Sequence, residues 1–545
     1  MDHPRAGKLP LESDLVDLAA LERAYYAQRP DPTNPAQRVS FGTSGHRGSS
    51  LEGSFNEAHI VAIAEAICDY RASQRIDGPL FIGIDTHALS IPALRSTIEV
   101  LVARGVDVVL PEGGEETFTP TPVISHAILR ANRDARGKRT DGIVITPSHN
   151  PPDSGGIKYD PPHGGPADLA ATSAIEARAN ELVARGFETI ARVPFAQAFT
   201  RTRRQDIMAA YVDDLASIVD MKAIAAAKLR LGVDPFGGAS LPYWSRIAER
   251  YGLDVTLLHS QVDKTFRFMP LDHDGKIRTD PSSPYVMSAL AAQKDSFDVA
   301  FANDADADRH GVVTRSCGFL PPNHYLSTVI AYLLDSRTGW RKDVAIGKTM
   351  VTSRMVDYVT RARGRRLAEV PVGFKWFVEG LIGGSYGFGG EESAGGSFLR
   401  LDGKVWTTDK DGPLLDLIGA EMLAKTGKDP GTHYRALEAA HGVSHYTRID
   451  AAANGEQKKR LKALTTSAVT ASEIAGEPIT SRVTTSPEGN APFGGLKVDT
   501  KNGWFAARPS GTEDIYKIYA ESFTSEDHLK RLLDEARALV DRAIT

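Results

Sequence analysis

The 545-residue sequence has few cysteines and no long hydrophobic run, and both absences exclude whole classes of protein. Its two cysteines, Cys68 and Cys317, lie far apart, so they form neither a disulfide framework nor a cysteine-rich zinc site. We expect two small buried thiols and a reducing, cytoplasmic setting. No uninterrupted apolar run reaches about 18 residues, which excludes a transmembrane helix. The N-terminal stretch MDHPRAGKLP has no apolar core region, so no secretory signal is expected.

An excess of charge of one sign is also absent. The chain has 64 Lys and Arg against 69 Asp and Glu, a net charge of −5. Because this charge is mild and no basic stripe interleaved with aromatic residues occurs, nucleic acid is not an expected partner. The 41% hydrophobic and 24% charged residues are typical of a globular protein. At about 150 residues per domain, the length predicts three or four domains.

Hydrophobic patterning predicts an α/β protein with a different C-terminal region. Residues 1–38 are polar, with one helical stretch over 11–28. From there to about residue 440, strand-like runs such as PLFIGID, DGIVITP and FDVAFAN alternate with helix-like runs. One of these helices opens with a capping box formed by Ser54 and Glu57. Such alternation favours α/β layers with mostly parallel sheets.

The last hundred residues contain short strands separated by turn signals and one closing helix that begins near Ser525. This pattern predicts a separate α+β domain. The changes in pattern place four domains at residues 1–205, 206–320, 321–445 and 446–545.

An acidic loop, NDADADRHG, directly follows the strand-like run FDVAFA. Its Asp304, Asp306 and Asp308 point the same way if the backbone is extended. Three like charges this close repel unless a cation neutralises them, and hard carboxylate oxygens favour Mg²⁺ or Ca²⁺. An EF-hand is excluded, because Arg309 and Arg315 stand where its loop needs Gly and Glu. A phosphatase with an aspartate nucleophile is a rival interpretation, but it needs Thr or Val where Asp308 stands.

A second loop, TPSHNPP, follows the strand-like run DGIVI and carries Ser148. The flanking prolines restrict the backbone and would hold Ser148 outward at the strand end. No Gly-x-Ser-x-Gly elbow surrounds it, so acyl transfer is not expected. A serine that carries phosphate is a phosphoryl donor, whose transferring group a metal and nearby cations would stabilise. His149 and Lys158 could supply protons or positive charge, whereas a turn-capping serine is the plain alternative.

Two further loops are suited to a sugar phosphate. The loop RPSGTE combines an arginine fork, hydroxyls and a glycine that lets backbone N–H groups approach an anion. The loop GEESAGG places Glu391 and Ser393 where they could bond neighbouring hydroxyls of a sugar ring. Because ligands bind beyond the carboxyl ends of strands in α/β sheets, loops from several domains suggest one shared cleft. A Walker A loop is absent, since Lys342 stands where its first glycine is required.

In chain order, the loops TPSHNPP, DADADRHG, GEESAGG and RPSGTE resemble the motifs of the α-D-phosphohexomutase superfamily, and FGTSGHRG at 41–48 resembles its opening motif. The resemblance covers almost the whole chain. Within the superfamily, GEESAG followed by VWTTDKDG is similar to the bacterial phosphoglucomutases. The resemblance implies three α/β domains with mixed sheets and a C-terminal α+β domain, arranged as a heart around a central cleft.

The resemblance also implies a role for each matching residue. Ser148 would be a phosphoserine that donates its phosphoryl group, and Mg²⁺ would be held by that serine with Asp304, Asp306 and Asp308. Arg47 and His149 would lie beside the phosphoserine, and Lys158 and Lys410 are the candidate bases of the two half-reactions. The implied substrate contacts are Glu391 and Ser393 to the sugar hydroxyls, Arg309 and Lys375 to sugar or phosphate, and Arg508, Ser510, Gly511 and Thr512 to the non-reacting phosphate.

The expected activity is the reversible interconversion of α-D-glucose 1-phosphate and glucose 6-phosphate through glucose 1,6-bisphosphate. The expected partners are small sugar phosphates, with neither nucleic acid nor membrane, for a monomer or homodimer. The alternatives are a sugar-phosphate phosphatase, a related mutase acting on mannose or glucosamine phosphates, and a catalytically silent relative. The last alternative is disfavoured because the serine, the three aspartates and both lysines are present.

Overall fold

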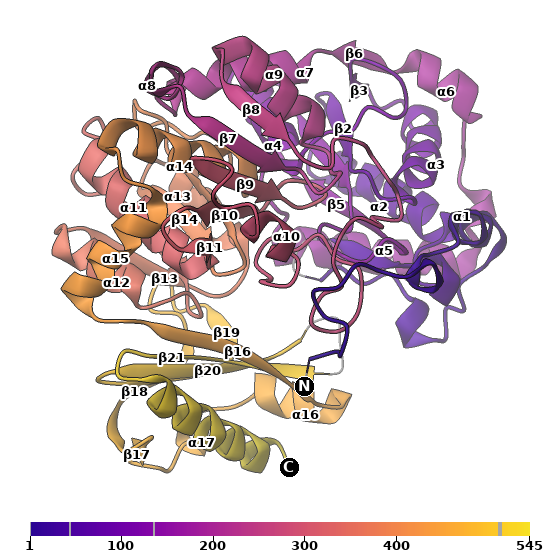
Figure 1. The fold of residues 1–545 in the computed structure, drawn as a ribbon. Helices are drawn as coiled ribbons and strands as arrows, with labels where there is room; N and C mark the ends of the chain where they lie inside the picture. The colour runs from indigo at the N-terminus through magenta and orange to yellow at the C-terminus, as the bar shows by residue number, and fades with distance from the viewer. Residues whose placement is uncertain (1, 43–44, 135–136, 511–514) are drawn as a thin grey trace. The chain divides into compact units, whose positions relative to one another are not determined.

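The computed structural model describes residues 2–42, 45–134, 137–510 and 515–545 (Figure 1). These residues form two compact units. Unit 1 comprises Met1–Pro322 and Ser393–Asp429, and unit 2 comprises Asn323–Glu392 and Pro430–Thr545. Among the described residues, no helix is both long enough and apolar enough to cross a membrane.

The first sheet of unit 1 is mixed and has the strand order β1-β5-β4-β2-β3-β6. The strands β4, β2, β3 and β6 run parallel to one another, whereas β5 is antiparallel to both β4 and β1. The strands are β1 (His46–Ser49), β2 (Leu80–Ile84), β3 (Val108–Pro111), β4 (Asp141–Ile145), β5 (Ser154–Asp160) and β6 (Arg203–Gln205). The helices of this region are α1 (Leu18–Ala27), α2 (Glu57–Ser73), α3 (Ser90–Ala103), α4 (Thr121–Asp134), α5 (Leu169–Arg185) and α6 (Phe195–Arg201).

The second sheet of unit 1 has the order β11-β10-β9-β7-β8. Its strands are β7 (Arg230–Asp234), β8 (Asp254–Leu257), β9 (Val299–Asn303), β10 (His310–Thr314) and β11 (Gly318–Leu320). The parallel strands β8, β7 and β9 are extended by β10, which is antiparallel to β9 and connected to it by the acidic loop. The remaining elements of unit 1 are α7 (Ile207–Asp214), α8 (Met221–Ala227), α9 (Leu241–Tyr251), α10 (Ser288–Ala291), β15 (Gly395–Phe398) and α14 (Gly412–Thr426).

Unit 2 contains a third α/β region and an antiparallel sheet. The strands β12 (Ala345–Thr349), β13 (Arg366–Val370) and β14 (Tyr386–Glu391) run parallel in the order β13-β12-β14. They are accompanied by α11 (Pro322–Ser336), α12 (Met355–Ala362), α13 (Val378–Ile382) and α15 (Pro430–His441). The antiparallel sheet has the order β16-β21-β20-β19-β18-β17. Its elements are β16 (His445–Ala452), α16 (Gly455–Lys462), β17 (Glu473–Ile474), β18 (Glu477–Thr485), β19 (Pro492–Thr500), β20 (Gly503–Pro509), β21 (Ile515–Ser522) and α17 (Glu526–Ile544).

This architecture confirms the prediction of three α/β regions followed by an α+β region. The runs PLFIGID, DGIVITP and FDVAFAN form β2, β4 and β9, whose residues are buried. The closing helix α17 begins as predicted, because the Ser525 side chain accepts a hydrogen bond from the N–H of His528. Its stripe of apolar residues, among them Leu532 and Val540, packs into the core of the antiparallel sheet.

Three local expectations were wrong. The helix expected over 11–28 is shorter and covers only α1, whose N-cap is Asp17. Helix α2 is capped by Asn56 instead of Ser54, and the Ser54 hydroxyl accepts the N–H of Ser49 at 3.0 Å instead. Cys68 is buried as expected, but Cys317 is exposed. The starts of α1 and α2 are set by their capping residues, Asp17 and Asn56, which outweigh the local pattern.

The glycines of β5 let the strand approach the loop that follows β4. A Cβ on Gly156 would lie only 2.1 Å from the carbonyl oxygen of Thr146, which is backbone and cannot move aside freely. We therefore expect Gly156→Ala to lower the free energy of unfolding by about 1–3 kcal/mol, the usual cost of overpacking. Gly114→Ala is the matched control, since a Cβ there meets nothing within 4 Å. Thermal unfolding of both variants tests this, and equal midpoints would contradict the close approach.

Candidate active site

The acidic loop between β9 and β10 gathers three buried carboxylates. Asp304, Asp306 and Asp308 each offer an oxygen, and these oxygens all lie within 4.8 Å of one another. The backbone is not extended as the spacing suggested, because Ala307 adopts a φ of 57° and turns the loop. The carboxylates therefore meet through a tight turn, although the expected grouping itself is correct.

The donor set of this loop suits a hard divalent cation. The Oδ1 atoms of Asp306 and Asp308 are buried and accept no hydrogen bond from any described residue. Burial, followed by the charges of Asp306 and Asp308, raises the pKa of Asp304 well above its ordinary value. A bound cation would stabilise the ionised form of Asp304 and would give the unsatisfied oxygens of Asp306 and Asp308 a partner. Carboxylate oxygens of this kind are ligands that fit Mg²⁺.

Neighbouring polar groups hold the acidic loop in place. The Thr121 hydroxyl, at the start of α4, donates to Asp306 Oδ2 at 2.6 Å, and the Thr121 N–H donates to the Asp306 carbonyl at 2.9 Å. At the end of β9, the Asn303 amide donates to the Arg309 carbonyl at 3.1 Å and to Asp416 Oδ2 at 2.7 Å. Helices α4 and α14 thus both support the loop.

Ser148 follows β4 and faces the acidic loop. Its hydroxyl donates to Asp304 Oδ2 at 3.1 Å, so two loops 156 residues apart in sequence meet at this atom pair. The side chain is buried instead of pointing outward, and the backbone has a φ of 60°. The structure therefore brings together the predicted phosphoryl donor and the predicted metal loop.

Both predicted lysines contact the triad. Lys158 Nζ of β5 donates to Asp306 Oδ2 at 2.7 Å and lies 3.4 Å from Asp308 Oδ2, while Lys410 Nζ lies 3.1 Å from Asp308 Oδ2. Burial lowers the pKa of Lys158, but Asp306 and Asp308 outweigh burial and leave this pKa raised. Burial raises the pKa of Asp308, but the two lysines outweigh it and hold that pKa well below its usual range. Lys158 is therefore an ammonium ion in this arrangement.

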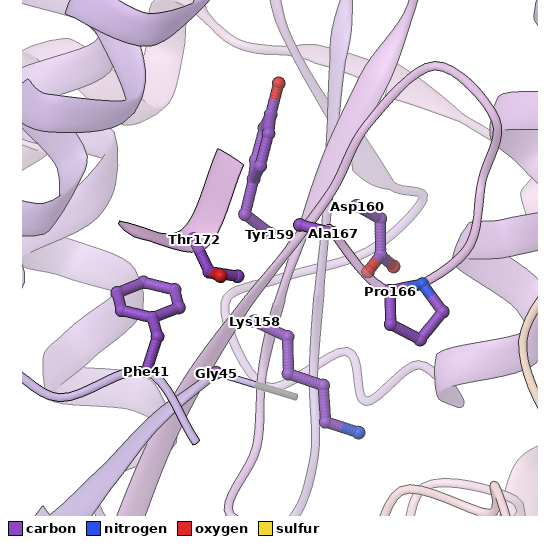
Figure 2. A pocket seen from close by; sticks show the side chains of 8 residues that line it. All are labelled: Phe41, Gly45, Lys158, Tyr159, Asp160, Pro166, Ala167 and Thr172. Atoms are coloured by element: carbon purple, nitrogen blue, oxygen red, sulfur yellow. The ribbon is translucent and has the colours of Figure 1, made fainter. Parts of the chain in front are cut away.

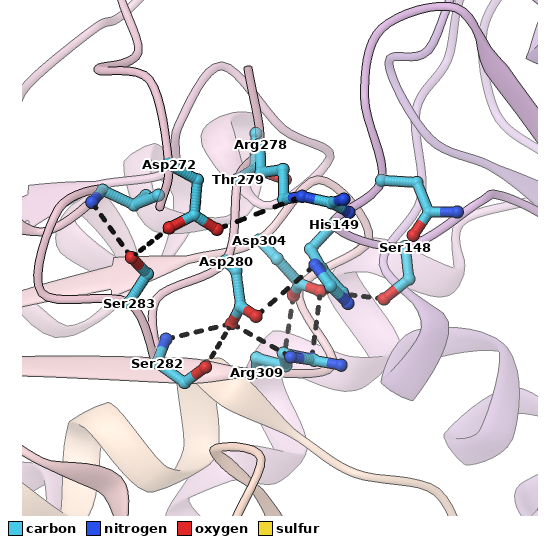
Figure 3. A network of polar contacts seen from close by, with 12 residues as sticks. Ser148, His149, Asp272, Arg278, Thr279, Asp280, Ser282, Ser283, Asp304 and Arg309 are labelled. Atoms are coloured by element: carbon cyan, nitrogen blue, oxygen red, sulfur yellow. Dashed lines mark hydrogen bonds and ion pairs between the residues drawn. The ribbon is translucent and has the colours of Figure 1, made fainter. Parts of the chain in front are cut away.

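A second ionic group, formed by Asp280, His149 and Arg309, lies next to Asp304 and Ser148 (Figure 3). Asp280 Oδ1 accepts a hydrogen bond from Arg309 Nη1 at 3.0 Å, and its Oδ2 lies 3.5 Å from His149 Nδ1. Burial and the Arg309 charge lower the pKa of His149 well below its ordinary value, so the imidazole is neutral. Burial lowers the pKa of the Arg309 guanidinium, but the charge of Asp280, with those of Asp304 and Asp308, outweighs burial and leaves this pKa raised. Arg309 is thereby a fixed cation that lies 3.9 Å from Asp304 Oδ2.

Arg47 and a small cavity complete the surroundings of Lys158. Arg47 lies in β1 opposite Gly156, and burial lowers its pKa despite the opposing charges of Asp306 and Asp308.

A cavity of about 10 Å³ lies beside Lys158 and Asp160, lined also by Phe41, Gly45, Tyr159, Pro166, Ala167 and Thr172 (Figure 2). Such a volume holds one water at most. It is therefore no substrate site.

The predicted sugar and phosphate residues are divided between the two units. In unit 2, the Glu391 carboxylate accepts the N–H of Gly373 at 2.9 Å, which places it beside the loop of Lys375. Arg508 lies in β20 opposite Lys517, and the N–H of Ser510 donates to Ile515 at 2.9 Å. Gly511 and Thr512 lie outside the described residues. In unit 1, Ser393 precedes Ala394, whose carbonyl accepts the N–H of His310 at 2.9 Å.

Sequence reasoning missed several partners of these residues. Asp280 and Thr121 lie in no motif that by itself indicates chemistry, and Asn303 begins the acidic loop but was given no role there. The only local signal at Asp280 is the turn TDPSS, in which its carboxylate accepts the Ser282 N–H at 3.0 Å. Such turns are common, so their sequence does not identify an active-site partner.

Family models match most of the chain. The four domains of the phosphoglucomutase/phosphomannomutase family match in order, with domain I at residues 38–185, domain II at 209–318, domain III at 321–440 and the C-terminal domain at 456–539.

Individual relatives agree with these matches. The phosphoglucomutase of Komagataeibacter xylinus is 54% identical over 98% of this chain and 96% of its own length. Among solved structures, the Paramecium phosphoglucomutase pp63/parafusin shares the fold, with a TM-score of 0.74, 19% identity and 95% of each chain covered. An N-acetylphosphoglucosamine mutase of Aspergillus fumigatus, solved with GlcNAc-6P and magnesium, has a TM-score of 0.50 at 16% identity, covering 78% of this chain and 93% of that one. Models of all four family domains match along the chain in order, and one relative of nearly equal length is 54% identical. The chain therefore belongs to the phosphoglucomutase/phosphomannomutase family of the α-D-phosphohexomutase superfamily.

Proposed function

We propose that this protein is a phosphoglucomutase, an isomerase that interconverts α-D-glucose 1-phosphate and glucose 6-phosphate. The observation that supports this proposal most directly is the distance of 3.1 Å between the Ser148 hydroxyl and Asp304 Oδ2 of the buried aspartate triad. A phosphoserine is a reasonable donor only where cations surround the transferring group, and Lys158, Lys410 and Arg309 supply them. The relative that is 54% identical over 98% of the chain bears the same activity in its name.

In the proposed reaction, phosphorylated Ser148 donates to a free hydroxyl of the sugar phosphate. The bond between phosphorus and the serine oxygen breaks with its electron pair left on the serine oxygen, and a bond to the sugar oxygen forms. The proton of the sugar hydroxyl passes to a base, and that proton is then available to neutralise the serine oxygen. Lys158 and Lys410 are the proposed bases of the two half-reactions. The triad holds Lys158 as an ammonium ion in this structure, so it would accept a proton only once a bound cation offsets the carboxylates that raise its pKa. Arg47 and Arg309 neutralise the phosphoryl oxygens, and the neutral His149 orients them. The reverse transfer, from the other end of glucose 1,6-bisphosphate, restores the phosphoserine.

Asp304, Asp306 and Asp308, with the oxygen of Ser148, would hold Mg²⁺. When bound, the ion would supply positive charge against the negative oxygens of the phosphoryl group. This proposal rests on the buried carboxylate oxygens that lack hydrogen-bond donors. The A. fumigatus mutase solved with magnesium has the same overall fold.

One serine must serve both ends of the sugar, so the bisphosphate has to turn over between the half-reactions. This requires a site that holds either phosphate while the other reacts. We propose that Glu391, Ser393 and Lys375 bind the sugar, and that Arg508 and Ser510, with Gly511 and Thr512, bind the distal phosphate. The cytoplasmic location and the monomeric or dimeric state remain predictions from the sequence.

A coupled assay that compares the 1-phosphates of glucose, mannose and glucosamine tests the substrate. We expect kcat/KM for glucose 1-phosphate to exceed the other two by roughly 10-fold or more, since a hydroxyl left unpaired in the site costs over 1 kcal/mol. Inorganic phosphate is measured in the same samples. Equal rates for all three sugars would contradict the assignment to glucose, and phosphate release at the turnover rate would indicate a phosphatase.

A further inference from the structure

The backbone of Ser148 adopts a conformation that a serine rarely takes. Its φ of 60° lies in the left-handed region, which disfavours every residue with a Cβ atom. The residue is buried and directly precedes the His149-Asn150-Pro151 segment. A strained conformation of this kind persists only where surrounding contacts fix it. Those contacts determine where the hydroxyl of Ser148 points.

Thr146 provides the first of these contacts. Its hydroxyl accepts the N–H of Ser148 at 2.8 Å and donates its own proton to Asp85 Oδ2 at 2.6 Å. The side chains of Thr146 and Asp85 are fully buried, so water does not compete for either bond. The N–H of Ser148 is thus connected, through one hydroxyl, to a carboxylate at the end of β2.

His87 provides the second contact, on the far side of Ser148. Its Nδ1 lies 2.7 Å from Asp85 Oδ2, and its Nε2 lies 2.9 Å from the Asn150 carbonyl oxygen. A carbonyl and a carboxylate only accept hydrogen bonds, so both ring nitrogens donate and the imidazole is a cation. The ion pair with Asp85 outweighs burial and raises the pKa of His87 in agreement with this assignment.

Asp85 itself is held firmly. Its Oδ1 accepts the Ser90 hydroxyl at 2.6 Å and the N–H of His87 at 3.0 Å, while its own N–H donates to the Ile145 carbonyl at 3.1 Å. The His87 ring also packs edge-on against Phe266, with 4.9 Å between the ring centroids. The pair is therefore a rigid, charged element inside unit 1.

We propose that the buried Asp85–His87 ion pair is a clamp that positions the nucleophile, holding the Ser148 loop at residue 146 through Asp85 and at residue 150 through His87. The inference rests on the proposed function, because it presupposes that Ser148 is the phosphoryl donor. Neither Asp85 nor His87 shows a contact to Ser148 itself, so both act as positioning residues. The clamp fixes the left-handed turn, and the turn directs the hydroxyl at Asp304.

The test compares Thr146→Val with Thr146→Ser. Valine keeps the branched shape but removes the hydroxyl, so the Ser148 N–H loses its acceptor, whereas serine keeps the hydroxyl. We expect kcat of Thr146→Val to fall by about 100-fold, the cost of a misplaced reacting atom, with KM changed by less than about 2-fold. Thr146→Ser should stay within about 3-fold of the unmodified enzyme. Equal loss in both variants, or none in Thr146→Val, would overturn the clamp.

His87→Phe tests the other half of the clamp, since phenylalanine keeps the aromatic contact to Phe266 and removes both N–H groups. If the pair acts as one unit, the double variant with Thr146→Val should be about as slow as the slower single variant. The clamp would be refuted if the fold-losses in kcat of the two single variants multiply in the double variant, or if His87→Phe keeps full activity. Circular dichroism and the unfolding midpoint identify a variant that fails to fold. Activity retained by Ser148→Ala would instead reject the proposed function, so the two failures are distinguishable.

Discussion

Ser148→Ala is expected to abolish mutase turnover while the protein stays folded. The alanine has no oxygen to carry the phosphoryl group, so both half-reactions lose their donor and acceptor. Removing a catalytic nucleophile lowers kcat by roughly 10⁴-fold or more. Folding should change little, because the hydroxyl makes one described hydrogen bond, to Asp304 Oδ2 at 3.1 Å.

The measurement is a coupled assay from glucose 1-phosphate, with mass spectrometry of the intact protein to count bound phosphate. The isolated wild-type protein, incubated with glucose 1,6-bisphosphate, should carry one phosphate that Ser148→Ala lacks. Ser154→Ala, six residues along the chain at the start of β5, is the control and should keep both phosphate and activity. Substantial turnover by Ser148→Ala would refute the phosphoserine mechanism.

Removal of the divalent cation is expected to have the second largest effect. Treatment with a chelator should lower activity by about 10³-fold, since a Lewis acid contributes several kcal/mol of charge stabilisation to phosphoryl transfer. Addition of Mg²⁺ should restore it. The reason is local, because the three buried carboxylates and the phosphoryl oxygens would repel one another, and the nearby lysines and arginines are monovalent cations already paired with the triad or with Asp280.

Asp304→Asn locates this effect in the triad. Loss of a residue that only hydrogen-bonds to a metal ligand lowers metal affinity by roughly 10–100-fold. Because Asp304 is a proposed ligand itself, we expect the Mg²⁺ affinity of the variant, measured by calorimetry, to fall by more than that. The control is Asp274→Asn in the second acidic cluster, Asp272-His273-Asp274, where Asp274 already pairs with Arg278 at 2.8 Å. The same loss of affinity in both variants, or in neither, would place the metal elsewhere.

The residues of the site could be predicted from the sequence where the chemistry lies in a short loop. Three aspartates at alternate positions, and a serine between prolines after a buried strand, were found in this way. Their geometry was not, because Ala307 and Ser148 both adopt a positive φ that no spacing rule anticipates. The expectations of an outward serine and an extended acidic loop were therefore wrong, while the roles assigned to these residues stay predictions.

The partners of these loops could not be predicted at all. Asp280, Thr121 and Asp85 act on loops that are 29, 185 and 61 residues away in sequence. None belongs to a motif, and an aspartate or threonine in a turn is common. Only the packing of strands and helices brings such groups to hydrogen-bond distance of the serine and the triad.

The sequence by itself determined the alternation of strands and helices, the order of the loops and the kinds of ligand they carry, because periodicity and residue type act over a few neighbouring positions. The tertiary structure decided the charges and directions of those groups. Ion pairs that outweigh burial make Lys158 an ammonium ion and His87 a cation, whereas burial keeps His149 neutral. Such states depend on what lies across a few ångströms of space, and that distance is set by the fold.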